Sequence, residues 1–217
     1  SVKSKSVNLP EVKIADGVLA TASLLKNEAQ AIEAMNQFKR SELLTSESEI
    51  VFSINNATVQ SKELSKQGIK DMKAFAKNAE SDSTMQLKGV AIVGFASPDG
   101  PEDGNENLAK NRQAAAEKAL KSSINGEYEA NYTAEDWEGF RMLMESSEIQ
   151  DKDAILNILS QYSDPVVRES EIKKMGTVYK EIADDILPQL RRSKIVVSAE
   201  KVGKSDSVLL AAGLGKS

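Results

Sequence analysis

Short runs of apolar and β-branched residues predict four β-strands in this chain. The clearest run spans residues 87–95 and ends in Val90, Ala91, Ile92, Val93, Gly94 and Phe95. Runs of this length, bounded by glycine, proline, serine and aspartate, are typical of strands. The four predicted strands cover residues 50–54, 87–95, 128–133 and 194–199.

Apolar positions spaced three or four residues apart predict two helices between these strands. The first helix takes Ser61 as its N-cap, because serine accepts a hydrogen bond from the first turn. The second helix spans residues 105–120 and is rich in alanine, which allows it to lie close to a sheet. The first helix carries its apolar side chains at Leu64, Ile69, Met72, Phe75 and Ala76.

A third stretch, residues 134–187, is predicted to be entirely helical. Trp137, Phe140 and Met144 follow the spacing of one helix face, and a last amphipathic helix is expected to stop at Pro188. This stretch is inserted before the last strand. The predicted organisation is therefore an N-terminal arm (1–48), an α+β domain (49–199) that contains the helical insert (134–187), and a C-terminal tail (200–217).

The composition argues against several classes of function. The 217 residues carry a net charge of −5, so the chain lacks the basic surface that nucleic-acid binding requires. Cysteine and histidine are absent, which removes disulfides, thiolate nucleophiles, the usual zinc ligands and the side chain best suited to proton transfer near pH 7. We therefore expect no nucleic-acid partner, no cofactor and no enzymatic activity.

The hydropathy of the chain predicts a soluble domain. With 40 % apolar and 28 % charged residues, the composition is that of an ordinary globular protein. No apolar run approaches the roughly 20 residues that span a bilayer, and residues 1–8 lack the apolar core of a signal peptide. Any export signal or lipid anchor is expected to lie outside this chain.

One strand, loop and helix sequence carries the most specific pattern. The predicted strand 87–95 leads into Ala96-Ser97-Pro98-Asp99-Gly100, and after a short acidic loop the chain continues with Asn105, Leu108 and Arg112. Such a junction gathers polar side chains and free backbone N–H groups at one place. The glycines at 94 and 100, followed by Asn-x-x-Leu-x-x-x-Arg, resemble the core motif of the OmpA C-terminal-like family.

This resemblance covers residues 49–133 and 190–199. The Ala96-Ser97-Pro98 turn and the insert containing Trp137 also resemble a Bacteroidetes-type branch of the family. The resemblance implies a mixed β-sheet with helices on one face and an all-helical insertion before the last strand. It further implies a non-catalytic periplasmic domain, associated with the outer membrane, that binds peptidoglycan and so tethers the envelope to the cell wall.

In this family the ligand is the diaminopimelate of the peptidoglycan stem peptide, a zwitterion that requires a fixed anion and a fixed cation. The resemblance assigns the cation to Arg112, because a guanidinium pairs with a carboxylate through two parallel hydrogen bonds. Ser97 stands where the family usually has aspartate, and Asp99 is the nearest candidate for a replacement anion. Asn105 and Arg191 match further positions of the family. Asn55 and Asn56 are candidates for lining the pocket.

Each of these residues also has a purely structural interpretation. Arg112 can pair with a surface carboxylate such as Glu106 or Glu117, and Asn105 can serve only as a helix N-cap. The segment 97–100 consists of turn-forming residues. The acidic loop 99–106 fails the EF-hand calcium template, since Pro101 and Lys110 fall at ligand positions.

Two other functions remain open at this point. In the first, the OmpA-like fold has lost its ligand site at Ser97, and the helical insert presents a face to a protein partner. In the second, paired carboxylates such as Asp99 and Asp103, or Glu135 and Asp136, hydrolyse a glycan. Acidic residues in loops and at helix starts usually serve capping and solubility, so no such pair is favoured.

Overall fold

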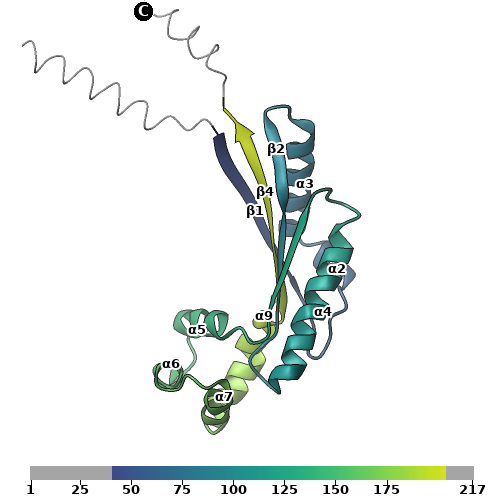
Figure 1. The fold of residues 1–217 in the computed structure, drawn as a ribbon. Coiled ribbons are helices and arrows are strands. Elements are labelled where there is room, and N and C mark those ends of the chain that lie inside the picture. The colour runs from purple at the N-terminus through teal and green to yellow at the C-terminus, as the bar shows by residue number, and fades with distance from the viewer. Residues whose placement is uncertain (1–40, 204–217) are drawn as a thin grey trace, which may run out of the picture. The chain divides into compact units, whose positions relative to one another are not determined.

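The structure is a computed structural model that describes residues 41–203 (Figure 1). Four strands form one mixed sheet in the order β1-β4-β2-β3. The central strand β4 pairs antiparallel with β1 and with β2, whereas β2 and β3 are parallel. The α+β class expected from the sequence is confirmed. The strands are β1 (Ser41–Val51), β2 (Met85–Phe95), β3 (Tyr128–Thr133) and β4 (Arg192–Val202).

Two long helices pack against one side of this sheet. Helix α3 (Gln67–Ser81) contacts β1 and β2, and helix α4 (Glu102–Leu120) contacts β2 and β3. Figure 1 shows both helices on the same side of the strands. The apolar side chains of the two helices and of the sheet form a single core, which includes Ile50, Phe52, Ile69, Met72, Ile92, Leu120, Ile195 and Val197.

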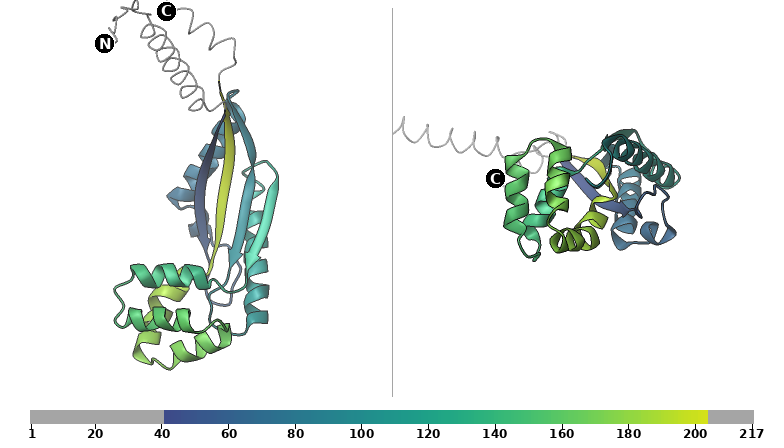
Figure 2. Two further views of the ribbon diagram at one scale, coloured as in Figure 1. Left: turned by 60° about the vertical axis from the view of Figure 1, so that its left-hand side comes forward. Right: turned by 90° about the horizontal axis from the view of Figure 1, so that it is seen from below.

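The insert folds into helices around a core of its own. The helices lie beside the end of the sheet where β2 stops and β4 begins (Figure 2). They are α5 (Trp137–Ser146), α6 (Lys152–Gln161), α7 (Pro165–Lys173), α8 (Thr177–Glu181), the π-helix η1 (Ile182–Ile186) and α9 (Leu187–Leu190). Their buried residues include Phe140, Met144, Ile155, Ile172, Ile182 and Leu190.

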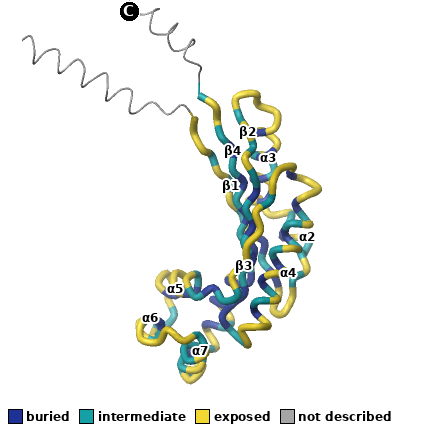
Figure 3. The backbone as a smooth tube through the Cα atoms, in the orientation of Figure 1, coloured by how far each residue is buried: buried dark blue, intermediate teal, exposed yellow. Residues whose placement is uncertain are grey.

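The first strand differs most from its predicted position. It was expected at residues 50–54 after an N-terminal arm, but β1 begins at Ser41 and ends at Val51. Its backbone pairs with β4 without interruption, from Ser41 opposite Val202 to Val51 opposite Arg192. Only Ile50 of this edge strand is buried, and in Figure 3 most of β1 carries the colours of exposed and intermediate residues. Because pairing with β4 forms the strand, the apolar pattern did not reveal it.

Several helix boundaries also differ from the predictions. Ser61 is the first residue of a short helix, α2 (Ser61–Leu64), whose N-cap is Gln60, and α3 starts separately at Gln67. Helix α4 begins at Glu102, so Asn105 lies inside it rather than at its mouth. Pro188 does not stop the insert, since a proline is tolerated in the first turn of α9.

A buried carboxylate ties α2 to the end of β1. Glu63 accepts hydrogen bonds from the Val51 N–H at 2.9 Å and from the Lys66 ammonium at 2.6 Å. Desolvation raises the pKa of Glu63, but these two bonds and the nearby charges of Lys66 and Lys62 together lower the pKa overall. The charged carboxylate therefore anchors the segment 52–60, which borders the candidate site.

The ends of the predicted organisation lie outside the described residues. Of the predicted arm, residues 41–48 belong to β1, and of the predicted tail, residues 200–202 belong to β4. Residues 1–40 and 204–217 are not described. Within residues 41–203, no helix has the length and apolar character needed to cross a membrane.

Candidate ligand-binding site

The loop after β2 is held in place by the strands on either side. The Ala96 N–H donates to the Thr133 carbonyl at 3.3 Å, and the Ala96 carbonyl accepts from the Asp136 N–H at 3.1 Å. The parallel pairing of β2 and β3 thus continues into the start of the insert. The Asp99 N–H then bonds to the Ser97 carbonyl at 2.8 Å, which closes a tight turn. Gly100 follows with a φ of 108°, a conformation that favours glycine.

Gly94 allows helix α4 to approach this end of β2. A Cβ atom at position 94 would lie 2.2 Å from the Ala109 carbonyl oxygen and 2.8 Å from the Gln113 backbone nitrogen. Only glycine, which has no Cβ atom, can occupy a position where the strand and helix backbones approach this closely. The glycine of the motif is therefore explained by packing, and that packing brings Arg112 against the end of the strand.

Arg112 is almost fully buried, with 1 % of its surface exposed. Its Nη1 donates to the Phe95 carbonyl at 2.9 Å and its Nε to the Asn56 carbonyl at 3.1 Å. Its Nη2 donates to the Ser53 carbonyl at 3.4 Å. The guanidinium thus connects α4, the end of β2 and the loop that follows β1.

The environment of Arg112 changes its ionisation without discharging it. Desolvation, together with repulsion from Arg191, lowers the pKa of Arg112 to about 10, while Asp99 acts in the opposite direction. Arg112 is therefore still positively charged at neutral pH. One structural interpretation of Arg112 was an ion pair with Glu106 or Glu117. These two carboxylates pair with Lys110 and Lys121 instead. That interpretation was wrong.

A second arginine, Arg191, meets the loop directly. Its Nε donates to the Ser97 hydroxyl at 3.3 Å, and its Nη2 lies 3.5 Å from Oδ2 of Asp99. Both bonds are long. The other oxygen of Asp99, Oδ1, is buried and has no hydrogen-bond partner among the described residues. The Asp99 carboxylate thus acts on two buried guanidinium groups, those of Arg191 and Arg112.

The insert covers this loop through two carboxylates. Oε1 of Glu169, on α7, accepts the Gly100 N–H at 2.6 Å. Glu135 accepts from the Asn105 amide at 3.3 Å and from the Trp137 indole N–H at 2.9 Å. Asn105 therefore links α4 to the insert; it is not the helix N-cap, which is Pro101.

The remaining candidates are not equally close to the charged cluster. Asn56 takes part through its carbonyl, while its side chain accepts the Thr58 N–H at 2.6 Å on the surface. Asn55 is exposed, with a φ of 50°. The neighbouring Arg192 pairs with Asp136 at 2.8 Å.

The space between loop and insert is small. A cavity of about 10 Å³ lies between Asp99 and the helices, which is room for no more than one water molecule. Its lining includes Pro98, Trp137, Glu169 and Tyr179. In the described conformation the cluster is therefore closed. Among residues 41–203, no group of three or more acidic side chains is arranged to hold a metal ion.

Sequence reasoning did not identify Glu169, and it named Glu135 only as one half of a carboxylate pair for glycan hydrolysis. Glu169 lies 69 positions from Gly100, and nothing in its local sequence pattern distinguishes it from other acidic residues of a helix. Compared with known proteins, the chain matches no family model and no curated protein sequence.

Proposed function

We propose that this domain binds peptidoglycan stem peptides without catalysis, as a periplasmic, outer-membrane-associated module of the OmpA-like type. The observation that carries the proposal is the pair formed by Asp99 and Arg191, whose charged atoms lie 3.5 Å apart beside the loop after β2. A zwitterionic ligand requires this combination of a fixed anion and a fixed cation. Asp99 then takes the role that Ser97 cannot fill, because a hydroxyl carries no charge.

The chemistry of each group defines its role in the proposed complex. The ligand ammonium would bind the Asp99 carboxylate, whose Oδ1 has no partner among the described residues. The ligand carboxylate would bind Arg191, whose present bonds of 3.3 and 3.5 Å are long enough to be exchanged for shorter ones. Arg112 stabilises the loop, since its N–H groups already donate to three backbone carbonyls.

Entry of a ligand requires the insert to move away from the loop. Glu169 occupies the Gly100 N–H, a group that would otherwise face a ligand carboxylate. The same contact favours a second candidate function, in which the loop is permanently closed and the domain acts as a protein interaction module. If the domain binds the cell wall, opening the loop produces affinity for the wall. If the domain is a protein interaction module, opening the loop produces none.

Removing either charge of the pair is expected to weaken binding to diaminopimelate-containing stem peptides and to purified sacculi. For Asp99→Asn and Arg191→Gln we expect a loss of about tenfold or more, because each removes one charge-assisted hydrogen bond of 1.5–3 kcal/mol. The measurement is a titration followed by the amide NMR shifts of Ala96, Ser97, Asp99 and Gly100. Asp103→Asn is the matched control, since this exposed carboxylate has no contact with the pair and should bind as the parent chain does. Equal affinity in all four proteins would contradict the proposal.

Opening the loop is expected to strengthen the same binding. Glu169→Ala frees the Gly100 N–H and removes a competing carboxylate, so we expect a severalfold higher affinity for the stem peptide, measured by the same titration. Glu171→Ala is the control, because Glu171 pairs with Lys174 on the same helix but does not contact the loop. Absence of binding in both the parent chain and Glu169→Ala would favour the interaction module instead.

A further inference from the structure

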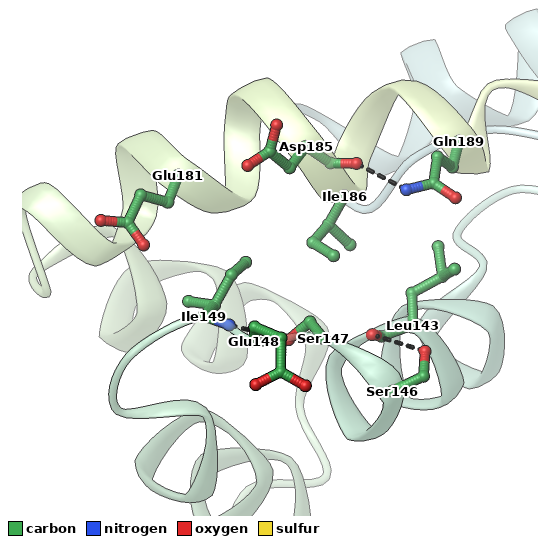
Figure 4. A pocket seen from close by; sticks show the side chains of 9 residues that line it. All are labelled: Leu143, Ser146, Ser147, Glu148, Ile149, Glu181, Asp185, Ile186 and Gln189. Carbon is green, nitrogen blue, oxygen red and sulfur yellow. Dashed lines mark hydrogen bonds between the residues drawn. The ribbon is translucent and has the colours of Figure 1, made fainter.

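A groove of about 400 Å³ opens on the surface of the insert, between the end of α5 and the segment from α8 to α9 (Figure 4). Its floor is apolar: the side chains of Leu143, Ile149 and Ile186 converge on its centre. The other lining residues are polar, namely Ser146, Ser147, Glu148, Glu181, Asp185 and Gln189. None of these residues borders the small cavity near Asp99. The groove is therefore separate from the proposed cell-wall site.

The groove is strongly acidic. Three of its lining residues are carboxylates, and no lysine or arginine is among the lining residues that the structure describes. Within residues 41–203, none of these carboxylates forms an ion pair. Lys152, the first residue of α6, donates instead to the carbonyls of Glu145 and Ser147.

The charge of the groove agrees with that of the whole insert. Residues 134–187 contain thirteen acidic and six basic residues, a net charge of −7, although the complete chain carries only −5. The acidic excess of this protein is thus concentrated in the insert. A surface of this kind attracts and orients cationic partners.

One wall of the groove has an unusual backbone. Asp185 and Ile186 belong to the π-helix η1, and Glu181 is its N-cap. A π-helix is rare and is found frequently at functional sites, because its extra residue per turn displaces side chains from regular α-helical positions. Here it places a carboxylate and an apolar side chain next to each other along the groove.

We propose that this groove binds a basic, partly apolar segment of a partner protein. The aliphatic stem of a lysine or arginine would lie over Ile149 and Ile186, and its charged group would pair with Glu181 and Asp185. A volume of about 400 Å³ accommodates one or two such side chains rather than a whole helix. The proposal does not depend on cell-wall binding.

The test uses two synthetic peptides and amide NMR of the full chain. Acetyl-Leu-Lys-Leu-Lys-Leu-amide is expected to produce saturable shifts at residues 147–149 and 181–189 that weaken with added salt. Acetyl-Leu-Glu-Leu-Glu-Leu-amide, which has the same apolar residues, is expected to produce none. Equal shifts from both peptides, or no shifts at millimolar lysine peptide, would overturn the proposal.

Charge-neutral variants locate the interaction. Glu181→Gln combined with Asp185→Asn is expected to weaken binding of the lysine peptide roughly fivefold, since exposed ion pairs are individually weak. The matched control combines Asp184→Asn with Glu171→Gln, which removes two charges from the same insert but none from the groove. A similar loss in both double variants would mean that only the general field of the insert attracts the peptide, and this result would overturn the assignment to the groove.

Discussion

Replacing Arg112 with methionine is expected to lower the free energy of unfolding by about 3–5 kcal/mol, the cost typical of removing one partner from a buried charged network. Methionine retains an unbranched apolar stem but has no donors. The carbonyls of Ser53, Asn56 and Phe95 would then lose the guanidinium that binds them. The measurement is urea unfolding followed by circular dichroism.

The control for this prediction lies on the same helix. Lys118 is exposed, so Lys118→Met should change the free energy of unfolding by no more than about 0.5 kcal/mol. If Arg112→Met were as stable as the parent chain, the three carbonyl contacts would not hold the loop. Because Arg112 is expected to affect stability, a loss of stem-peptide binding in its variants cannot by itself identify a ligand contact. The variants of Asp99 and Arg191 provide that evidence.

The ionisation of Arg112 explains why the cluster needs Asp99. Its pKa is lowered to about 10 by burial and by Arg191, which leaves the Arg112 guanidinium charged at pH 7. Arg191 repels the buried Arg112 cation, and the Asp99 carboxylate acts on Arg112 in the opposite direction. Asp99 therefore offsets part of the repulsion at Arg112, and in the proposed complex its Oδ1, which has no partner among the described residues, is the atom that the ligand ammonium would bind.

The sequence predicted the central elements of the fold well, because these elements bury regular apolar faces. β2 and β4 alternate between buried and less buried positions, and their predicted spans lie within the observed strands. The polar strand β1 was misplaced, since its formation depends on the backbone of β4 rather than on its own side chains. Local pattern carries no information about such pairing.

The candidate site was predicted only in part, for a related reason. The motif located the loop, Asp99 and Arg112 on neighbouring elements, and the family resemblance added Arg191 as a candidate. The contact between Arg191 and Asp99 joins residues 92 positions apart, and the contact between Glu169 and Gly100 joins residues 69 apart. Contacts of this separation depend on how the insert packs on the sheet, which the spacing of residues along one chain does not specify.

Replacing Gly94 with alanine is expected to lower the free energy of unfolding by about 3 kcal/mol, at the upper end of the usual cost of overpacking. The added Cβ would lie 2.2 Å from the Ala109 carbonyl oxygen, which is a backbone atom of α4 and cannot rotate away. The whole helix must therefore retreat from β2. Since α4 carries Arg112, this retreat also lengthens the 2.9 Å bond from Arg112 Nη1 to the Phe95 carbonyl.

The same substitution at Gly104 provides the control, because a Cβ there meets no atom within 4 Å. Gly104 lies in the first turns of α4, so Gly104→Ala should leave stability unchanged or raise it by up to about 1 kcal/mol. In a double-mutant cycle, Gly94→Ala and Arg112→Met should destabilise less together than the sum of their separate effects, since both act on the contact between α4 and β2. Strict additivity in urea unfolding would show that Gly94 and Arg112 act independently, and it would contradict the role assigned here to the glycine that ends the strand.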